Sequence, residues 1–478
     1  MDIATKNNRA ILGINIQYIV DKRIVLRTLA MIRLKESHTA VHLVEVVLGI
    51  LAEFGIALDQ LFSVTTDNAG YMLLSSEILD EIAEEDSDGT EYAEMSEEQI
   101  DEEFYRQLLK DTEQEFLHYT TPEHVKSIPC GAHRFQLAIQ DAFAESSKAD
   151  NLIGKIRGVM KKLRTPNLCN ALNEQNMKKP FLDNKRRWNG KYFMVKRCLE
   201  LREFVDMMAV TDKTFKITDA EWLDLEELRD VLHDCAEFTK TIQGVQITLS
   251  DFYAEWVQLK LKLQPKQRIK FVDNLIKHMG KRGNDLLTDP LVLASLFLDM
   301  RYRVLLNTKP IQKQLAMNQL TLLWKRVCSL RPENQQVENT SEATSDTGGT
   351  ENDSNVMDSY LDSLESSSYQ PSTNTASEDI MFKLQQYNVE AEQKKREPKT
   401  RHPMDFWYEN RHTMPELYEL AKLVFAVCPT ETSVERNFSG LSYVLNRYRG
   451  NLTDKNLETI MFVRLNKELF DRVIIKLQ

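Results

Sequence analysis

The spacing of apolar residues changes along this chain, and that change constrains its fold more than any other feature. Apolar residues alternate over residues 10–34, where Asp21-Lys22 separates two runs, which predicts a β-hairpin. Residues 44–51 repeat at helical spacing, and an apolar run over residues 61–66 ends at Asp67. From about residue 134 to 330 almost every segment has the spacing of an amphipathic helix. The sequence therefore predicts an α/β beginning followed by an all-α region.

Two acidic segments conceal a basic remainder. Residues 77–115 carry 17 Asp/Glu and 2 Lys/Arg, and residues 333–379 carry 11 Asp/Glu and no Lys/Arg. The net charge is therefore −15 for residues 77–115 and −11 for residues 333–379. The other 392 residues carry +15, which gives the total of −11. Residues 148–202 alone hold 15 Lys/Arg against 4 Asp/Glu. This distribution allows an anionic partner such as nucleic acid, although lysine-rich helices can also simply solvate their outer faces.

Several classes of protein are disfavoured at this point. The best apolar stretch, Leu43–Leu51, is interrupted by Glu45 and is far too short to span a bilayer. Residues 1–10 contain no apolar run typical of a signal peptide. The six cysteines are scattered and form no CxxC pair, which favours free thiols in a reducing compartment. Secreted, membrane and disulfide-scaffold proteins are therefore not expected.

Three motifs and their order carry a resemblance. Residues 1–5 read MDIAT just before the hairpin, residues 65–69 read TTDNA at the end of a strand, and residues 428–439 read CPTETSVERNFS. Between them stand Cys130-Gly131-Ala132-His133, Arg187-Trp188 and Leu298-Asp299-Met300-Arg301. This order resembles the hAT superfamily of cut-and-paste DNA transposases, the hobo–Activator group, over nearly the whole chain. The SxERxFS pattern of Ser433–Ser439 is its most specific element.

The resemblance implies a fold and a division into domains. It implies a ribonuclease H-like α/β core that is split by a long helical insertion, with a C-terminal helical dimerisation region. Residues 1–140 would form the N-terminal part of the core, with an acidic insert at 77–118, and residues 141–330 the helical insertion. Residues 331–380, rich in acids, Ser, Thr and Asn, read as a disordered linker, and residues 381–478 would complete the core and dimerise.

The resemblance also places a catalytic triad. It maps the catalytic carboxylates of the family to Asp2, Asp67 and Glu435. Phosphodiester cleavage needs charge neutralised at both the attacking and the leaving oxygen, which two divalent ions provide. Mg²⁺ or Mn²⁺ bound by these three carboxylates would serve in an active enzyme. For a lone Asp at a strand end, capping of a following helix is the ordinary alternative.

Strand cleavage is nevertheless expected to be lost or impaired, so that enzymatic activity stays uncertain. Only Met1 precedes Asp2, whereas a strand needs several residues to pair. Residues 3–6 read IATK, which departs from the aromatic-Thr-Ser pattern of the family. The BED-type zinc finger that many members carry at the N-terminus has no room here. The chain therefore reads as a fragment or as the remnant of a transposase.

Two groups of residues are candidates to support the site. Within Lys185-Arg186-Arg187-Trp188, the resemblance implies that Trp188 stacks on a flipped base while the cations hold phosphates. The alternative is a buried core tryptophan beside a solvated basic turn. Cys130, His133 and Arg436 are expected to be structural or to support the site from close by. No zinc site is expected, because the Cys and His spacing matches no standard finger.

Apolar stripes in the C-terminal hundred residues predict helices that need a packing partner. Part of this region is expected to pack on the α/β core and carry Glu435 into the site, and part to form a subunit interface. Sequence does not divide the two, because both bury the same residue types. The expected dimerisation residues are Trp407, Leu417, Leu420, Val424, Phe425, Phe438, Leu457, Ile460 and Met461.

The sequence thus favours a transposase-derived nuclear protein that dimerises and binds DNA. A basic run, KKREPK at residues 394–399, is a weak signal for nuclear import. One alternative is an active Mg²⁺-dependent transposase. Another is a protein-interaction scaffold that does not bind DNA and recruits proteins through its acidic segments. No membrane partner and no small-molecule cofactor are expected.

Overall fold

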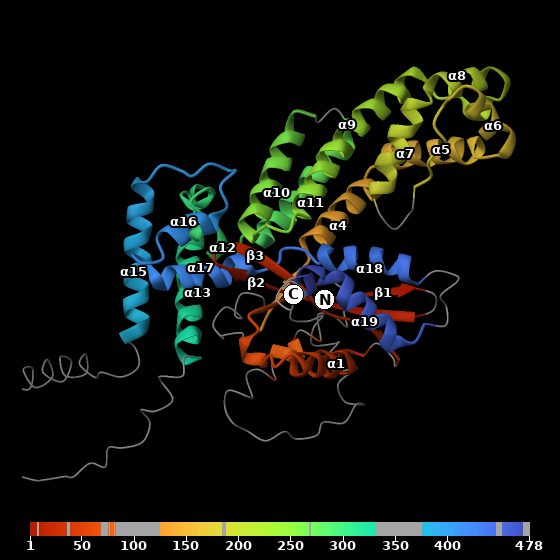
Figure 1. The fold of residues 1–478 in the computed structure, drawn as a ribbon. Helices are drawn as coiled ribbons and strands as arrows, with labels where there is room; N and C mark the ends of the chain where they lie inside the picture. The colour runs from red at the N-terminus through yellow and green to blue at the C-terminus, as the bar shows by residue number, and fades with distance from the viewer. Residues whose placement is uncertain are drawn as a thin grey trace, which may run out of the picture. The chain divides into compact units, whose positions relative to one another are not determined.

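The structure is a computed structural model, and it forms two compact units. It describes residues 1–6, 9–35, 39–67, 75, 77–80, 82, 125–183, 188–266, 269–330, 375–445 and 452–471. The first unit joins Met1–Thr288 to Phe425–Gln478, and the second is Asp289–Val424 (Figure 1). In these described ranges, no helix is both long and apolar enough to cross a membrane.

A small antiparallel sheet opens the first unit. Its strands lie in the order β1 (Asp2–Lys6), β2 (Arg9–Val20) and β3 (Arg23–Leu34). The predicted hairpin is confirmed, because Asp21-Lys22 joins β2 to β3 and Asp21 takes a φ of 52°, which suits such a tight turn. The predicted apolar face of β2 is only partly buried. Tyr18 and Val20, near the turn, are 41% and 48% exposed.

A second, parallel pair of strands lies beside the start of β1. The 3₁₀ helix η1 (Leu58–Gln60) leads into β4 (Ser63–Thr66), which pairs with β5 (Lys126–Pro129). The backbone nitrogen of Met1 donates a hydrogen bond to the carbonyl oxygen of Thr65 at 2.8 Å. The first residues of β1 therefore lie beside the end of β4, where Asp67 follows.

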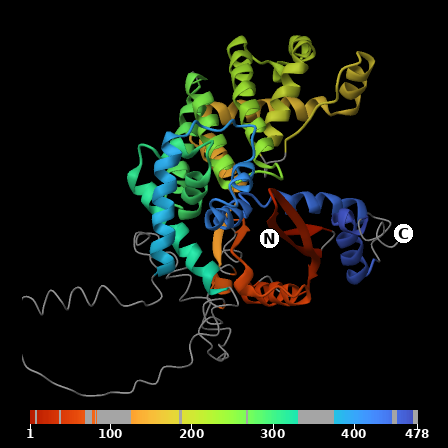
Figure 2. The same cartoon turned by 60° about the vertical axis from the view of Figure 1, so that its left-hand side comes forward.

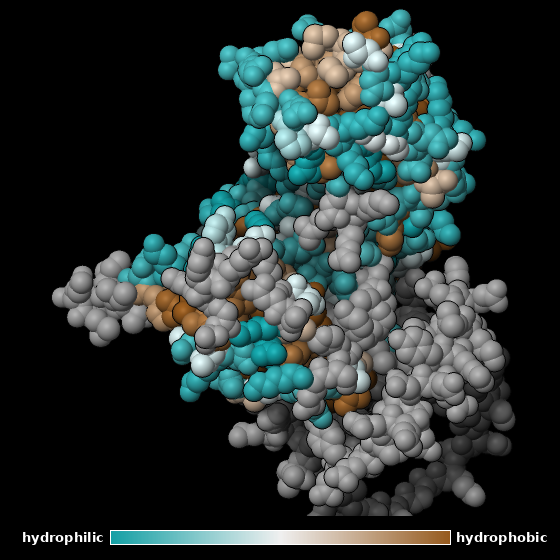
Figure 3. Space-filling model, turned by 90° about the vertical axis from the view of Figure 1, so that its right-hand side faces the viewer, coloured by the Kyte–Doolittle hydropathy of each residue, from teal (hydrophilic) through white to brown (hydrophobic). Residues whose placement is uncertain are grey.

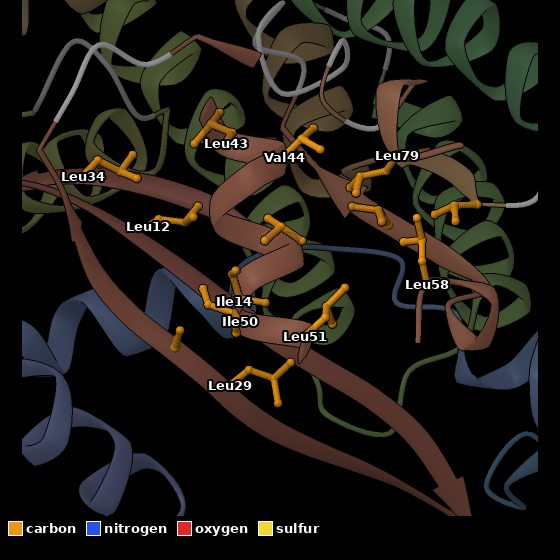
Figure 4. Packing of buried hydrophobic residues seen from close by; sticks show 14 residues of the cluster. Leu12, Ile14, Leu29, Leu34, Leu43, Val44, Ile50, Leu51, Leu58 and Leu79 are labelled. Atoms are coloured by element: carbon orange, nitrogen blue, oxygen red, sulfur yellow. The ribbon is translucent and has the colours of Figure 1, made fainter. Parts of the chain in front are cut away.

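Helices cover both faces of the antiparallel sheet (Figure 2). Successive side chains of a strand point to opposite faces, so that neighbours on β2 enter different cores. Leu12 and Ile14 pack with α1 (Ala40–Glu53) on one face (Figure 4). Ile11 packs on the other face with α18 (Thr432–Val444) and α19 (Asp454–Leu465). As expected from the sequence, the C-terminal helices pack on the strands and complete this part of the unit.

From residue 131 to residue 286 the described residues of the first unit are mostly helical, as the spacing after residue 134 predicts. Thr218 and Thr248 cap two of the helices, each with an acidic residue three positions later in a capping box. The apolar stripes face inward, and aromatic rings such as Trp222 and Phe271 are fully buried. The helices are α4 (Gly131–Ala144), α5 (Ser147–Leu163), α6 (Pro166–Glu174), α7 (Asn189–Glu200), α8 (Arg202–Thr211), α9 (Asp219–Ile242), α10 (Leu249–Leu263) and α11 (Lys270–Leu286), with the 3₁₀ turns η3 (Lys213–Phe215) and η4 (Gln264–Lys266).

The second unit is built around a helix that is buried on all sides. Every residue of α12 (Pro290–Leu298) is buried, and the indole of Trp407 donates to the carbonyl of Leu298 at 3.0 Å. A buried ion pair joins Asp299 to Arg301 at 2.8 Å. The other elements are η5 (Arg303–Leu306), α13 (Pro310–Ser329), α15 (Thr375–Gln393), α16 (Pro403–Glu409) and α17 (Pro415–Ala426), most of which lies in this unit.

The described part of the protein is therefore mostly helical, and it contains two small sheets. Strands β1 to β3 form the first sheet near the start of the chain, and β4 and β5 form the second. The compact units divide the chain after residues 288 and 424, whereas the predicted boundaries at 140, 330 and 380 follow changes in composition. The two kinds of boundary differ because the division after residue 288 lies between two consecutive helices, where no acidic or low-complexity segment marks it. Most of the predicted acidic insert 77–118 and linker 331–380 lies outside the described residues.

Candidate metal centre

Asp2 and Asp67 stand at the adjoining ends of the two sheets. Asp2 is the first residue of β1, and its Oδ1 accepts a hydrogen bond from the backbone nitrogen of Ile3 at 2.7 Å. Asp67 directly follows β4. The hydroxyl of Thr65 donates to the carbonyl oxygen of Cys428 at 2.7 Å, which ties the end of β4 to the segment that leads into α18.

The first turn of α18 brings glutamates to the same place. Glu435 lies in that turn, and Glu431 is the residue that caps it. Asn15 of β2 fixes the helix on the sheet, since its side chain donates to the hydroxyl of Ser433 at 3.1 Å and accepts from Asn437 at 3.0 Å. These two hydrogen bonds fix the position of the start of α18 relative to β2, and so the position of Glu431 and Glu435.

Three of the carboxylates form a compact cluster. Asp2, Glu431 and Glu435 each offer an oxygen, and these oxygens lie within 4.8 Å of one another. Asp67 is close enough for its charge to act on both Asp2 and Glu431. The structure therefore brings together all three residues of the predicted triad, although Glu435 lies hundreds of positions after Asp2 and Asp67 in the sequence, and adds a fourth carboxylate.

Glu431 is the residue that sequence reasoning missed. Its side chain is buried, with 7% of the residue exposed, and its Oε2 has no hydrogen-bond partner among the described residues. A buried charged group without a partner is costly unless a cation or a proton neutralises it. The only sequence signal was its position four residues before Glu435 in the same motif.

The proton affinities of the cluster reflect its crowding. Burial, together with the charges of Asp67 and Glu435, raises the pKa of Asp2 to about 6. Burial and the charges of Asp2 and Asp67 raise the pKa of Glu431 to about 8, although the terminal ammonium group opposes this. At neutral pH the raised pKa favours a proton on Glu431, and a cation bound by the cluster would replace it.

The donor set suits a hard divalent cation. All the converging atoms are carboxylate oxygens, which Mg²⁺ and Mn²⁺ prefer, and the partnerless oxygen of Glu431 points to a position still to be neutralised. Cys130 is buried and its Sγ accepts from the backbone nitrogen of Glu431 at 3.5 Å. Burial raises the pKa of this thiol and so disfavours the thiolate that zinc would need.

Two segments of the chain match known protein-family models. Residues 383–466 match the hAT family C-terminal dimerisation region, and residues 128–231 match the ZBED1 RNase-like helical domain. These two matches support a hAT-family, transposase-derived protein. Among curated proteins, no match to the chain was found. The second match spans α4 to α8 and the first half of α9, and the first includes α18 with Glu435 and its N-cap residue Glu431.

Other residues predicted to support the site lie close to the carboxylate cluster. Cys130 immediately precedes α4, and the backbone nitrogen of Gly131 donates to the carbonyl of Pro429 at 2.9 Å, so this segment contacts the one before α18. His133 is half-buried in the first turn of α4, and Arg436 is exposed on α18. Cys130 thus touches Glu431 of the cluster directly, as a structural role beside the site requires.

The expected base-stacking role of Trp188 does not match its position. Trp188 is only 5% exposed, and its ring packs edge-on against Phe135 with centroids 6.0 Å apart. Its indole face is therefore unavailable to a nucleobase in this structure, which corresponds to the alternative of a core tryptophan. Lys185, Arg186 and Arg187 lie outside the described residues.

This burial predicts the behaviour of a Trp188→Phe variant. We expect the variant to lose about 1–2 kcal/mol of unfolding free energy, because a smaller ring leaves part of a closely packed site empty. Its affinity for DNA should stay within twofold of the parent's. Chemical denaturation and fluorescence anisotropy measure the two effects. An unchanged stability with a large loss of DNA affinity would show instead that the ring faces the ligand.

Most of the predicted dimerisation residues are buried inside the protomer. Trp407, Leu420 and Val424 are fully buried, as are Phe425 and Met461. Leu417 and Leu457 are buried almost completely, and Phe438 is partly buried against the core between the sheet and α19. Only Ile460, at 40% exposed, reaches the surface substantially. The dimerisation region supports self-association, but these stripes stabilise the protomer itself, because intrachain packing takes the same residue types as an interface.

Proposed function

We propose that this hAT-family protein is a dimerising, nuclear DNA-binding protein in which Asp2, Asp67, Glu431 and Glu435 bind a divalent cation. The observation that carries the proposal is the convergence of these carboxylates from β1, β4 and α18. Mg²⁺ or Mn²⁺ held there would neutralise charge on a bound phosphodiester. The two sheets with α1, α18 and α19 would then serve as a ribonuclease H-like core.

The helical part of the first unit supports DNA as the partner. Several cations of the basic stretch 148–202 are used in internal ion pairs, such as Lys155 with Glu221 at 2.6 Å. Others project from the surface, and these are free to approach phosphates. Among the described residues of this stretch, the exposed cations outside such ion pairs include Lys161, Arg164, Lys179 and Lys196. The exposed basic run Lys394–Arg396 after α15 is consistent with nuclear import.

DNA binding of this kind has a characteristic salt dependence. With about four phosphate contacts, affinity for a duplex should fall roughly 100-fold between about 50 and 200 mM salt. Replacing Lys161 and Arg164 with Gln should lower the salt slope by about two, while Lys240→Gln on α9 should leave it unchanged. Fluorescence anisotropy measures this. A stable dimer in light scattering without any DNA binding at low salt would favour the interaction scaffold.

In this proposal strand cleavage is weak or lost. Metal must displace the proton of Glu431 at neutral pH, and Trp188 is buried rather than presented to DNA. The second candidate function is active Mg²⁺-dependent cleavage, which the carboxylate cluster itself favours. Nicking of a supercoiled plasmid with Mg²⁺ or Mn²⁺ that disappears in Asp67→Asn would establish the enzyme. Equal, negligible nicking by both proteins would support a binding role.

A further inference from the structure

A groove with two exposed aromatic rings lies on the helical part of the first unit. Its volume is about 330 Å³, within the roughly 300–1,000 Å³ range of small-molecule sites. Phe181 and Phe193 are 39% and 49% exposed, although phenylalanine is a residue that proteins usually bury. The lining residues are Lys178, Phe181, Phe193, Lys196, Arg197 and Glu200.

Helix α7 presents one wall of the groove. Phe193, Lys196, Arg197 and Glu200 follow at the spacing that brings side chains to one helical face. The opposite face is held in the core, where the hydroxyl of Tyr192 lies 3.0 Å from Nδ1 of His233 on α9. Because that contact fixes the rotation of α7, the ring of Phe193 faces outward as part of the packing.

The segment before α7 forms the other wall and is held on both sides of Phe181. Arg157 of α5 makes two hydrogen bonds to Asp183, at 2.8 and 2.7 Å. Arg197 of α7 donates to the carbonyl oxygen of Lys179. These contacts place the rings of Phe181 and Phe193 with centroids 5.9 Å apart and planes at 66°. The aromatic surface is therefore organised before any ligand arrives.

The rim of the groove is positively charged. Lys178, Lys196 and Arg197 supply three cations against the single carboxylate of Glu200. Glu200 accepts from Arg197 at 3.0 Å and from Lys178 at 3.3 Å, so it holds two of these cations beside the rings. Lys196 is exposed. Figure 3 shows this helical region, where small hydrophobic patches interrupt a largely hydrophilic surface.

We propose that this groove binds unpaired nucleobases of single-stranded DNA. A base would stack on the Phe193 or Phe181 ring, and the adjacent phosphates would contact Lys178, Lys196 and Arg197. Stacking of one base on one aromatic ring contributes roughly five- to 150-fold in affinity and tolerates any base, because every base has a π face. An apolar peptide would use the rings but not the cations at the rim, so charge complementarity favours the nucleic acid.

The inference rests on the proposed DNA binding and names the form of DNA that the groove takes. Fluorescence anisotropy with a labelled oligothymidine of about 16 nucleotides and with a duplex of similar length tests it on the full chain. The double variant Phe181→Ala/Phe193→Ala should lose at least about tenfold in affinity for the single strand. Its affinity for the duplex should change less than twofold. Phe193→Tyr, which keeps the ring, should retain the affinity for the single strand.

A matched control and the remaining outcomes make the test decisive. Phe382→Ala removes a phenylalanine of α15 that is 65% exposed, and it should leave both affinities unchanged. Single-strand affinity that survives in the double variant would overturn the inference and leave a protein segment as the occupant of the groove. An equal loss for both forms of DNA would also overturn it, because stacking would not be the cause. If the parent binds neither form, the proposed function fails as well.

Discussion

In metal-free buffer, the free energy of unfolding of the first unit is expected to fall by about 3–5 kcal/mol as the pH rises from about 5 to about 8, although the lowered pKa of the Met1 ammonium group opposes part of this fall. The cause is the carboxylate cluster. Asp2 and Glu431 have pKa values raised to about 6 and about 8 by burial and by their charged neighbours. Denaturant titrations at a series of pH values, with EDTA present, measure the effect.

The direction of this change follows from proton binding. The unfolded chain loses the protons of both carboxyls near pH 4, at their ordinary pKa values. The folded protein keeps them up to about pH 6 for Asp2 and about pH 8 for Glu431. Between these limits the two carboxyls bind more protons in the folded state than in the unfolded state, so their contribution to stability decreases as pH increases. This is opposite to the usual effect of a carboxylate in a salt bridge. Burial lowers the pKa of the Met1 ammonium group, which therefore contributes in the opposite direction to the two carboxyls.

Two changes should remove this loss of stability. Glu431→Gln cannot acquire the buried charge, so we expect the variant to be more stable than the parent at pH 8 and similar to it at pH 5. Addition of Mg²⁺ should stabilise the parent most at pH 8, because the cation replaces the proton, and it should stabilise the variant less. Glu203→Gln, at an exposed position on α8, serves as the control. Parallel pH curves for the parent and Glu431→Gln, with no response to Mg²⁺, would contradict this account.

Much of the fold around the site was predictable because it depends on local signals. Alternation over residues 10–34 and the Asp21-Lys22 turn specify a hairpin without reference to the rest of the chain. The apolar stripe over residues 44–51 became the buried face of α1. Whether such elements form a ribonuclease H-like core is a question of how the two sheets combine, and the spacing of residues in one strand does not contain that information.

The functional residues were less predictable because their roles depend on distant contacts. Trp188 packs against Phe135, which lies 53 positions earlier in the chain, and no local sequence pattern indicates that contact. Glu431 appeared as an ordinary polar residue, since only the fold of β1 against α18 surrounds it with other carboxylates. For Phe193 the misleading signal is the reverse. An aromatic residue on an amphipathic helix normally indicates a buried position, yet Phe193 lies on the exposed face of α7.

Gly13 controls how closely α18 can approach the sheet, and it provides the second large effect. It is the partner of Asp2 in the register between β1 and β2. A Cβ added at Gly13 would lie 2.5 Å from Cγ1 of Val434, 3.1 Å from Sδ of Met31 and 3.2 Å from Cζ of Phe438. The Val434 side chain is too short to move aside, so the helix that carries Glu431 and Glu435 must shift instead.

We therefore expect Gly13→Ala to reduce the free energy of unfolding by about 1–3 kcal/mol through overpacking. It should also weaken Mn²⁺ binding by at least about tenfold, because ligation tolerates little displacement of the glutamates. Isothermal titration calorimetry with Mn²⁺ on the folded full chain measures the second effect separately from the first.

The matched substitution is Gly49→Ala on α1, where an added Cβ meets nothing within 4 Å. Because glycine disfavours a helix interior, this variant should gain about 0.5–1 kcal/mol and bind Mn²⁺ like the parent. The double variant Gly13→Ala/Val434→Ala removes the clashing methyl, so Mn²⁺ affinity should recover by more than the two single changes predict when added. Strict additivity in this cycle would mean that the contact between Gly13 and Val434 does not position the glutamates. The link between the sheet and the carboxylate cluster would then have to lie in the hydrogen bonds of Asn15 to α18.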